Sequence, residues 1–356
     1  MVKPIERKEY ANNSERLAAL KRAATSTNKK LGIECVTMAD DIEDTKRAPF
    51  GVSSIDTFIG GGIPHGSFTV GWGGAGSGKT TLGLNLAKTA QDDGKLVAWI
   101  ALEPFPKDRA QLFGINLAEM PVIQCPQAEQ SLDIIIDYAR NKLVDVLILD
   151  SIHSLAPKGM QENSKGEKSL TEETMAILAR KLSEFFKIAI DPIKRSNMAV
   201  FLIGQTRIKL GIISLDDLTG GNALKHNSRL TMHIRRGAKD DSPTRTLITP
   251  EGKKIEDVIG FPCVIKLDKV QVSGAQKELS AINIPYYFDT GFKAPADIQA
   301  NIDAEEAEIK AQQAPQVEEP IEPTVETPVV KVAISSSGPY SASVEKKKRG
   351  RPKKGA

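Results

Sequence analysis

The sequence predicts an α/β protein in which helices cover both faces of a mostly parallel β-sheet. Continuously apolar runs at 68–71, 96–102, 145–150 and 198–204 are typical of strands that are buried on both faces. Stretches with helical periodicity alternate with these runs, which favours parallel strands joined by crossover helices. A glycine-rich segment also links the first strand to a helix, and this is the setting of a phosphate-binding loop.

The chain begins with a short helical arm, residues 1–33. Leu17, Leu20 and Ala24 are spaced to form one modest apolar stripe, which is too small to fold alone. We therefore expect the arm to pack on another surface, such as that of a neighbouring subunit, and to serve in oligomerisation.

The candidate nucleotide site starts at the glycine-rich loop. Its glycines let backbone N–H groups turn toward a β-phosphate, and Lys79 would neutralise the β- and γ-phosphates of ATP. Thr80 offers a hydroxyl to Mg²⁺, and the following helix, 79–90, directs its positive end at the phosphates. A chance match is the alternative, but the motif has the strand and helix that it requires. The predicted nucleotide contacts here are Gly73, Gly74, Ala75, Gly76, Ser77, Gly78, Lys79, Thr80 and Thr81.

Three polar residues at the ends of the neighbouring strands complete this prediction. Asp150 ends the strand 145–150 and would bind Mg²⁺ and its waters. Glu103 follows the strand 96–102, where a carboxylate could polarise the water that attacks the γ-phosphate, although a simple exposed acid is the alternative. Gln205 follows 198–204 and could sense the γ-phosphate or be a turn residue. We expect ATP and Mg²⁺ as cofactors.

The rest of the core extends to residue 292. Apolar spacing predicts helices over 130–141 and 170–194, and later strands are expected at 261–269 and 284–288. We therefore assign a single core domain to residues 34–292.

The composition changes after this core. Residues 293–345 are predicted to form a disordered linker, because prolines recur and residues 301–330 contain eight acidic residues and only one lysine. Residues 346–356 form a basic tip whose Arg-Gly-Arg-Pro core resembles an AT-hook. Arg349 and Arg351 could lie in a narrow A·T minor groove, whereas a solubilising or targeting tail is the alternative.

Composition limits the remaining possibilities. The 356 residues carry a formal net charge of +3, so the basic tip stands out and indicates a polyanionic partner. Three widely separated cysteines fit neither a disulfide framework nor a zinc site and indicate a reducing compartment. No apolar run approaches the ~20 residues of a membrane helix, and we expect no membrane partner.

The segment 206–221 has the composition of a loop that contacts DNA. Arg207 and Lys209 would bind phosphates, and the glycines would allow close approach of the backbone. Ile212 and Ile213 could wedge between bases. An ordinary mobile loop is the alternative, but two adjacent exposed isoleucines are unusual without a partner.

The order of these motifs is similar to that of the bacterial and phage RecA recombinases. Gly60-Gly61-Gly62-Ile63-Pro64, before the phosphate loop, resembles the entry segment of that family. The stretch 204–211, followed by Thr219-Gly220-Gly221-Asn222-Ala223-Leu224-Lys225, resembles its second DNA-binding loop. The resemblance covers the chain from about residue 33 to residue 288.

This resemblance implies a RecA-type ATPase that forms helical filaments on single-stranded DNA and exchanges strands with a homologous duplex in recombination and repair. It implies that Glu103, Lys79 and Gln205 act in catalysis, with Gln205 as the γ-phosphate sensor. Residues 157–170 take the place of the first DNA loop, and 206–221 that of the second. The location implied is the cytoplasm of a bacterium or of a phage-infected cell. The DNA contacts implied are Arg180, Lys187, Arg207, Lys209, Ile212, Ile213, Gly220, Gly221, Asn222 and Lys225.

The chain also departs from the family. Two family lysines, two residues apart on a late strand, reach the ATP of the neighbouring subunit. Here Lys269 fits the first position, Gln271 takes the second, and Lys266 is a nearby substitute. The aromatic residue on which the family stacks adenine has no counterpart, and Arg109 lies near its place. The linker and the basic tip replace the folded C-terminal domain of the family.

Two other functions stay open at this point. A ring-shaped helicase or regulatory ATPase could use the same core, but such proteins lack the signature at 220–225. A DNA-packing protein could use the basic tip with a degenerate nucleotide site, yet the intact Lys79, Thr80, Asp150 and Glu103 argue against that function. We therefore expect a DNA-dependent ATPase.

Overall fold

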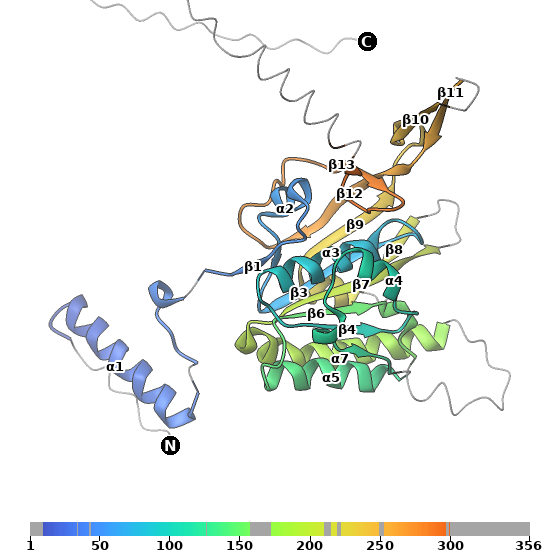
Figure 1. Ribbon diagram of the computed structural model, residues 1–356. Coiled ribbons are helices and arrows are strands. Elements are labelled where there is room, and N and C mark those ends of the chain that lie inside the picture. The colour runs from blue at the N-terminus through green and yellow to red at the C-terminus, as the bar shows by residue number, and fades with distance from the viewer. Residues whose placement is uncertain are drawn as a thin grey trace, which may run out of the picture. The chain divides into compact units, whose positions relative to one another are not determined.

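A mixed, mostly parallel β-sheet organises the fold (Figure 1). The computed structural model describes residues 10–296 and residue 299, apart from residues 34, 43, 126, 157–171, 210–214, 219–221 and 249–252. Within this part of the chain the strands lie in the order β13 (Ile282–Tyr287), β12 (Gly260–Val270), β9 (Ser228–Arg236), β3 (Ser67–Gly73), β7 (Ala199–Lys209), β6 (Val146–Asp150), β4 (Val97–Ala101) and β5 (Val122–Ile123). The strands from β9 to β5 run parallel, whereas β12 is antiparallel to both of its neighbours.

Helices cover both faces of this sheet, as predicted. One face carries α2 (Ser53–Ile59), α3 (Lys79–Asp92) and α4 (Lys107–Leu112), and the other carries α5 (Ala128–Arg140), α7 (Glu172–Ser196) and α8 (Asn222–Asn227) (Figure 1). Each face has its own apolar core, because successive residues of a strand point to opposite faces. On β6, Val146 and Ile148 pack in the core beneath α3, while Leu147 and Leu149 pack in the core beneath α5 and α7. The predicted fold class is confirmed.

The predicted core elements are present, with shifts of a few residues at their ends. The helix after the phosphate loop begins at Lys79. The residues of β6, and those of β7 as far as Gly204, are buried, which explains why both strands read as continuous apolar runs. The first two residues of the helix expected over 170–194 lie outside the described residues.

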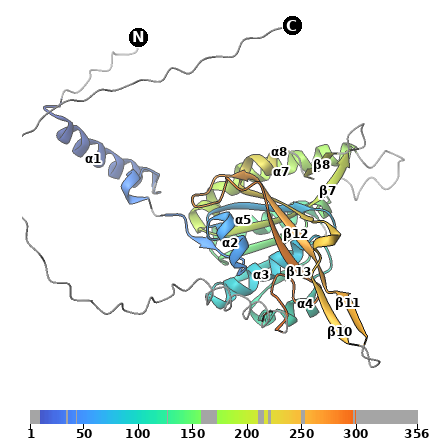
Figure 2. The same cartoon turned by 90° about the horizontal axis from the view of Figure 1, so that it is seen from above.

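Two small two-stranded sheets flank the main one. β1 (Arg47–Ala48) pairs with β2 (Ile63–Pro64), and β10 (Thr244–Ile248) pairs with β11 (Lys254–Val258). The β10–β11 hairpin connects the end of β9 to the start of β12, and it extends beyond the main sheet in both views (Figures 1 and 2).

The N-terminal arm contains one helix, α1 (Asn13–Leu31). The side chain of Asn12 caps it by accepting a hydrogen bond from the backbone N–H of Glu15, and Gly32 ends it in the left-handed conformation. None of the residues of α1 is buried, and Leu17 and Leu20 are 46% and 56% exposed. The apolar stripe of the arm is therefore uncovered in the single chain.

The chain divides into two compact units, residues 1–304 and 305–356, and all described residues belong to the first. Nearly all of the predicted linker and the whole basic tip thus lie outside the described part of the chain. None of the described helices is both long enough and apolar enough to span a bilayer.

Candidate functional site

The phosphate-binding loop connects β3 to α3. A Cβ atom on Gly73 would lie 1.8 Å from the carbonyl oxygen of Ile234 on β9, so only glycine fits there. Gly78 has a φ of 98°, which side chains disfavour, and it turns the chain into the helix that begins at Lys79. The glycines therefore serve close packing and the turn that directs the first N–H groups of α3 into the loop.

Lys79 lies within the loop and is only 6% exposed. Its Nζ donates hydrogen bonds to the carbonyl oxygen of Gly74 at 2.6 Å and to Oγ of Ser77 at 3.4 Å. Burial lowers the pKa of Lys79, and the negative charges of Asp150 and Glu103 oppose this shift in part. Since a buried ammonium group is costly without an anionic partner, the loop is well suited to bind a phosphate.

Asp150 and Thr80 meet at the C-terminal end of β6. Oγ1 of Thr80 donates a hydrogen bond to Oδ2 of Asp150 at 2.8 Å. Burial raises the pKa of Asp150 to about 6, although the bond from Thr80 acts in the opposite direction. One hydroxyl and one carboxylate beside a phosphate loop form the donor set with which Mg²⁺ usually supplements substrate phosphates. These residues fit the predicted Mg²⁺ site, in which substrate phosphates would supply further ligands. The described part of the chain contains no cluster of three or more His, Cys, Asp or Glu side chains that could hold a metal.

Glu103 and Gln205 come together from β4 and β7, which lie on either side of β6. Nε2 of Gln205 donates a hydrogen bond to Oε1 of Glu103 at 3.0 Å, and Oγ of Ser151 donates to the same oxygen at 2.5 Å. The Glu103 side chain is 37% exposed, so water can reach it. The predicted sensor, Gln205, is thus hydrogen-bonded directly to the carboxylate of the predicted catalytic residue, Glu103.

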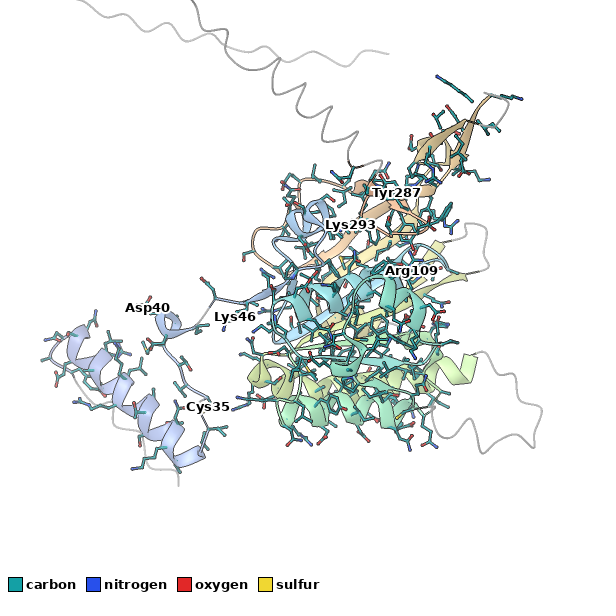
Figure 3. The ribbon with its side chains drawn as sticks, viewed as in Figure 1. Cys35, Asp40, Lys46, Arg109, Tyr287 and Lys293 are labelled. Atoms are coloured by element: carbon teal, nitrogen blue, oxygen red, sulfur yellow. The ribbon has the colours of Figure 1, made fainter. Side chains whose placement is uncertain are left out.

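Tyr286, which was missed in the sequence, lines the cavity of about 130 Å³ at the loop together with residues 76–81. Its hydroxyl lies 2.9 Å from Oγ1 of Thr81 and accepts a hydrogen bond from Arg109 at 2.8 Å. Its ring stacks on Phe261 with a centroid distance of 4.5 Å. Arg109 (Figure 3) is thereby held at the cavity, and Thr81 bonds to the tyrosine. The available signal was a tyrosine pair near the end of a late strand.

His153 was also missed. It belongs to the short 3-10 turn Ile152–Ser154, directly after β6, and its Nδ1 lies 2.5 Å from Oγ of Ser151. The available signal was a histidine three residues beyond the aspartate that ends a buried strand, at the edge where the polar residues of the site collect.

Lys266 and Lys269 share one face of β12, although they are three residues apart. Lys266 pairs with His233 of β9 and Lys269 pairs with Thr231, because the register shifts between the two lysines. His233 and Thr231 are alternate residues of β9 and point to the same face. This β-bulge therefore gives the lysines the relation of residues two apart in a regular strand.

Asp268 is the extra residue of this bulge. Its Oδ2 accepts a hydrogen bond from Nε1 of Trp72 at 2.9 Å, and its Oδ1 lies 4.0 Å from Nζ of Lys266. Nζ of Lys269 donates to the carbonyl oxygens of Lys225 and His226 at the C-terminal end of α8. The Lys266 side chain is 58% exposed, whereas Lys269 is held by α8 in the single chain.

The predicted DNA contacts within the described chain lie on α7, β7 and α8. Arg180 and Lys187 are exposed and two turns apart, hence on the same side of α7. Lys225 places its ammonium group 5.8 Å from the ring centroid of Trp72. Arg207 and Lys209 belong to β7 and Asn222 begins α8, with only their backbones described.

Parts of the segment 206–221, which was expected to be a loop, are strands. Residues 206–209 of β7 pair in antiparallel fashion with β8 (Leu215–Leu218), and both views place β8 beside the end of β7 (Figures 1 and 2). This pairing satisfies backbone groups of β7 where the strand extends past its neighbours in the main sheet. The other predicted contacts lie outside the described residues: Ile212, Ile213, Gly220, Gly221, the first DNA loop at 157–170, Arg349 and Arg351.

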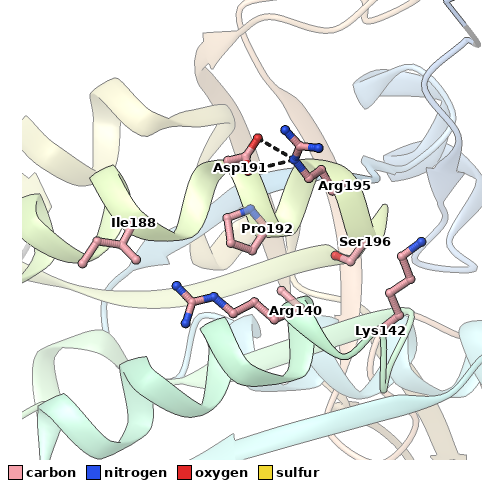
Figure 4. A pocket seen from close by; sticks show the side chains of 8 residues that line it. Arg140, Lys142, Ile188, Asp191, Pro192, Arg195 and Ser196 are labelled. Carbon is pink, nitrogen blue, oxygen red and sulfur yellow. Dashed lines mark hydrogen bonds and ion pairs between the residues drawn. The ribbon is translucent and has the colours of Figure 1, made fainter. Parts of the chain in front are cut away.

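A larger groove of about 690 Å³ lies between α5 and α7 (Figure 4). Arg140, Lys142 and Arg195 line it, and Arg195 is bonded to Asp191. The groove is built on the C-terminal ends of the helices that precede β6 and β7. It therefore lies at the opposite edge of the sheet from the phosphate loop and is separate from the candidate site.

Several known proteins resemble this chain in sequence or in structure. A family model described as the RecA N-terminal domain matches residues 18–284. Protein RecA of Geobacter sulfurreducens is 31% identical over 291 residues, which cover 80% of this chain and 80% of the relative. Protein RecA of Nautilia profundicola is 34% identical over 225 residues, which cover 61% of this chain and 63% of the relative. A crystal structure of the RadB recombinase aligns over 68% of this chain and 97% of that chain, with a TM-score of 0.47 and 18% identity.

Proposed function

Because the chain belongs to the RecA family, whose members act in DNA recombination and repair, we propose that it is a DNA-dependent ATPase that forms filaments on single-stranded DNA and exchanges strands with a homologous duplex. The observation that carries this proposal is the convergence of Lys79, Asp150 and Glu103 at one edge of the sheet. A non-enzymatic protein with a degenerate site would not need a buried ammonium group, a carboxylate for a metal and a water-accessible carboxylate together.

The phosphates of ATP would bind over the loop. Lys79 would exchange its bonds to Gly74 and Ser77 for bonds to phosphate oxygens. Thr80 and Asp150 would hold Mg²⁺, which when bound neutralises charge on the phosphates.

Glu103 would act on the attacking water. Its Oε1 already accepts bonds from Gln205 and Ser151, so Oε2 is the oxygen that would accept the proton of the water. A bond forms between the water oxygen and the γ-phosphorus while the bond from phosphorus to the bridging oxygen of ADP breaks. The products are ADP and phosphate.

Gln205 would couple this reaction to DNA. Its amide is bonded to Glu103, and a γ-phosphate would compete for that amide. Gln205 lies on β7, which continues directly into the β7–β8 hairpin. A change of partner at Gln205 would therefore shift the strand that carries Arg207 and Lys209 toward DNA.

The filament contacts are proposed from two features. Lys266 and Lys269 lie on one face of β12 and would reach the ATP of a neighbouring copy, in which case Lys269 would leave the carbonyl oxygens of α8. The uncovered stripe of α1 would pack on the core of a neighbour, since most of the stability of a helix in a protein comes from packing of its apolar face.

One experiment tests the proposal. ATP hydrolysis is measured with and without single-stranded DNA, and the same samples are imaged by electron microscopy. We expect DNA to stimulate hydrolysis and open filaments to form, and Lys79→Ala to abolish hydrolysis. Closed rings would favour a helicase or regulatory ATPase, while DNA binding without any hydrolysis would favour a packing protein.

A further inference from the structure

The hydroxyl of Ser151 connects Glu103 to a histidine that the proposed reaction does not use. Oγ of Ser151 lies 2.5 Å from Oε1 of Glu103 and 2.5 Å from Nδ1 of His153. His153 Nδ1 and Glu103 Oε1 are 3.7 Å apart. The histidine is thus one hydrogen bond removed from the proposed catalytic carboxylate.

The directions of these bonds follow from the protons available. A hydroxyl has one proton to donate, and an ionised carboxylate can only accept. Since Ser151 donates its proton to Glu103, its oxygen must accept from His153, which therefore carries a proton on Nδ1. The bonds run from Nδ1–H to Oγ–H to Oε1, and each one strengthens the next.

This arrangement fixes the rotation of the Glu103 carboxylate. Oε1 receives two donors, Ser151 and Gln205, whereas no described residue is hydrogen-bonded to Oε2. Ser151 can make its bond only while its proton points at Glu103. A hydroxyl group rotates freely, so a donor that occupies its lone pair helps the carboxylate to hold that proton in place.

We propose that His153 is a positioning residue for ATP hydrolysis. Its Nδ1–H orients the Ser151 hydroxyl, Ser151 holds Oε1 of Glu103, and Oε2 is left facing the attacking water. This inference rests on the proposed ATPase activity. The His153 side chain is 31% exposed and lies at the edge of the site. The phosphate contacts assigned to the loop do not include it, so its removal should act on turnover and leave ATP binding intact.

The test compares replacements of His153 whose amide nitrogen takes the place of one ring nitrogen or of the other. In the full-length protein with saturating single-stranded DNA, kcat and KM for ATP are measured for wild type, His153→Ala, His153→Asn and His153→Gln. The amide nitrogen of asparagine lies near the place of Nδ1, and that of glutamine near the place of Nε2. We expect His153→Ala to lower kcat about tenfold with KM within about twofold, as for the loss of one orienting hydrogen bond. Asparagine should recover most of the loss and glutamine should not.

Two further variants sharpen this test. Ser151→Ala should lower kcat as much as His153→Ala, and the double variant should lower it no further, because both act through one bond. Ser154→Ala is the matched control: Oγ of Ser154 lies 3.4 Å from Nε2, the other ring nitrogen, and its loss should leave kcat within about twofold.

Three outcomes would overturn the positioning role: wild-type kcat in His153→Ala, equal rescue by glutamine and asparagine, or additive losses in the double variant. Thermal unfolding and MgATP binding are recorded for each variant. If His153→Ala fails to fold, the comparison of asparagine with glutamine decides alone. Absence of hydrolysis in wild type would instead refute the proposed function, and the positioning role with it.

Discussion

Nε2 of Gln205 donates a hydrogen bond to Oε1 of Glu103 at 3.0 Å, across the end of the strand β6 that separates β7 from β4. The bond joins the residue proposed to sense the γ-phosphate to the residue proposed to activate water. Loss of Glu103 should therefore affect mainly hydrolysis, whereas loss of Gln205 should affect mainly the coupling of nucleotide to DNA binding.

Glu103→Gln should keep ATP binding and stop hydrolysis. An amide cannot accept the proton of the attacking water, and kcat should fall by at least about a hundredfold, the usual contribution of a general base. Filaments should then persist on DNA, because ATP is not consumed. Steady-state hydrolysis and dissociation from labelled single-stranded DNA check this expectation, with the exposed Glu119→Gln as control. Normal turnover in Glu103→Gln would mean that another residue is the base.

Gln205→Ala should still bind ATP but lose the link between nucleotide and DNA. In wild type, a non-hydrolysable ATP analogue should raise the affinity for single-stranded DNA relative to ADP. Without the amide, the two nucleotides should give the same affinity in fluorescence anisotropy. A variant that still distinguishes them would place the sensor elsewhere.

Asp150→Asn should stabilise the nucleotide-free protein at pH 8. Burial raises the pKa of Asp150 to about 6 from its ordinary 3.8. Protonation of Asp150 therefore stabilises the folded state. This stabilisation is complete below pH 3.8 and is lost as the pH rises through 6. The asparagine variant avoids that loss and should gain up to about 3 kcal/mol at pH 8, with a gain about half as large at pH 5. Urea unfolding at both pH values measures it. The variant should also lose the stabilisation that MgATP gives wild type, and a gap independent of pH would contradict the assignment.

Deletion of residues 1–33 should leave a folded monomer that makes no filaments. None of the residues of α1 is buried, so the core loses little when the arm is removed. Circular dichroism tests folding and sedimentation velocity tests assembly. Replacement of Leu17 and Leu20 by serine should have the same effect with the helix retained, and intact assembly in both variants would refute the role of the arm.

The basic tip should add duplex binding to a core that binds single strands. Truncation after residue 344 should spare ATPase stimulated by single-stranded DNA and weaken duplex binding, most strongly at low salt, because seven cationic residues are lost between 346 and 354. Truncation after residue 300 also removes the acidic segment, which would compete with DNA, and should impair duplex binding less. Equal duplex affinity of both truncations across a salt series would exclude competition by the acidic segment. Equal affinity of the full chain for A·T-rich and G·C-rich duplexes would exclude the AT-hook.

Much of the core could be predicted because its signals are local. The strands β6 and β7 are buried on both faces, so their apolar runs are continuous, and the loop and its lysine form one contiguous motif. β9 gave no such run, since Leu230, Met232 and Ile234 alternate with polar residues. Its polar positions are covered by particular partners: His233 stacks on Trp72 with centroids 4.0 Å apart. Such a contact joins residues that are far apart in the sequence, so it leaves no local pattern from which β9 could be predicted.

In the candidate site, too, the residues carried by local motifs could be predicted and those that depend on tertiary contacts could not. Lys79, Thr80 and Asp150 follow from a loop and a strand end, whereas Tyr286 reaches the loop from a strand about two hundred residues later in the sequence. His153 required knowledge that the turn after β6 folds back on Glu103. Residue spacing cannot supply such convergence, because it depends on which strands become neighbours.

The bulge at Asp268 adds one residue to β12 without turning Lys266 and Lys269 to opposite faces. An inserted residue is accommodated by Trp72, and the two flanking lysines keep a common direction. Spacing along the sequence alone would pair Lys269 with Gln271, two residues later, whereas the bulge places Lys269 on the same face of β12 as Lys266. Removal of Asp268 should shorten the strand without turning either lysine away, so natural variation in length at this point is expected to be neutral for assembly.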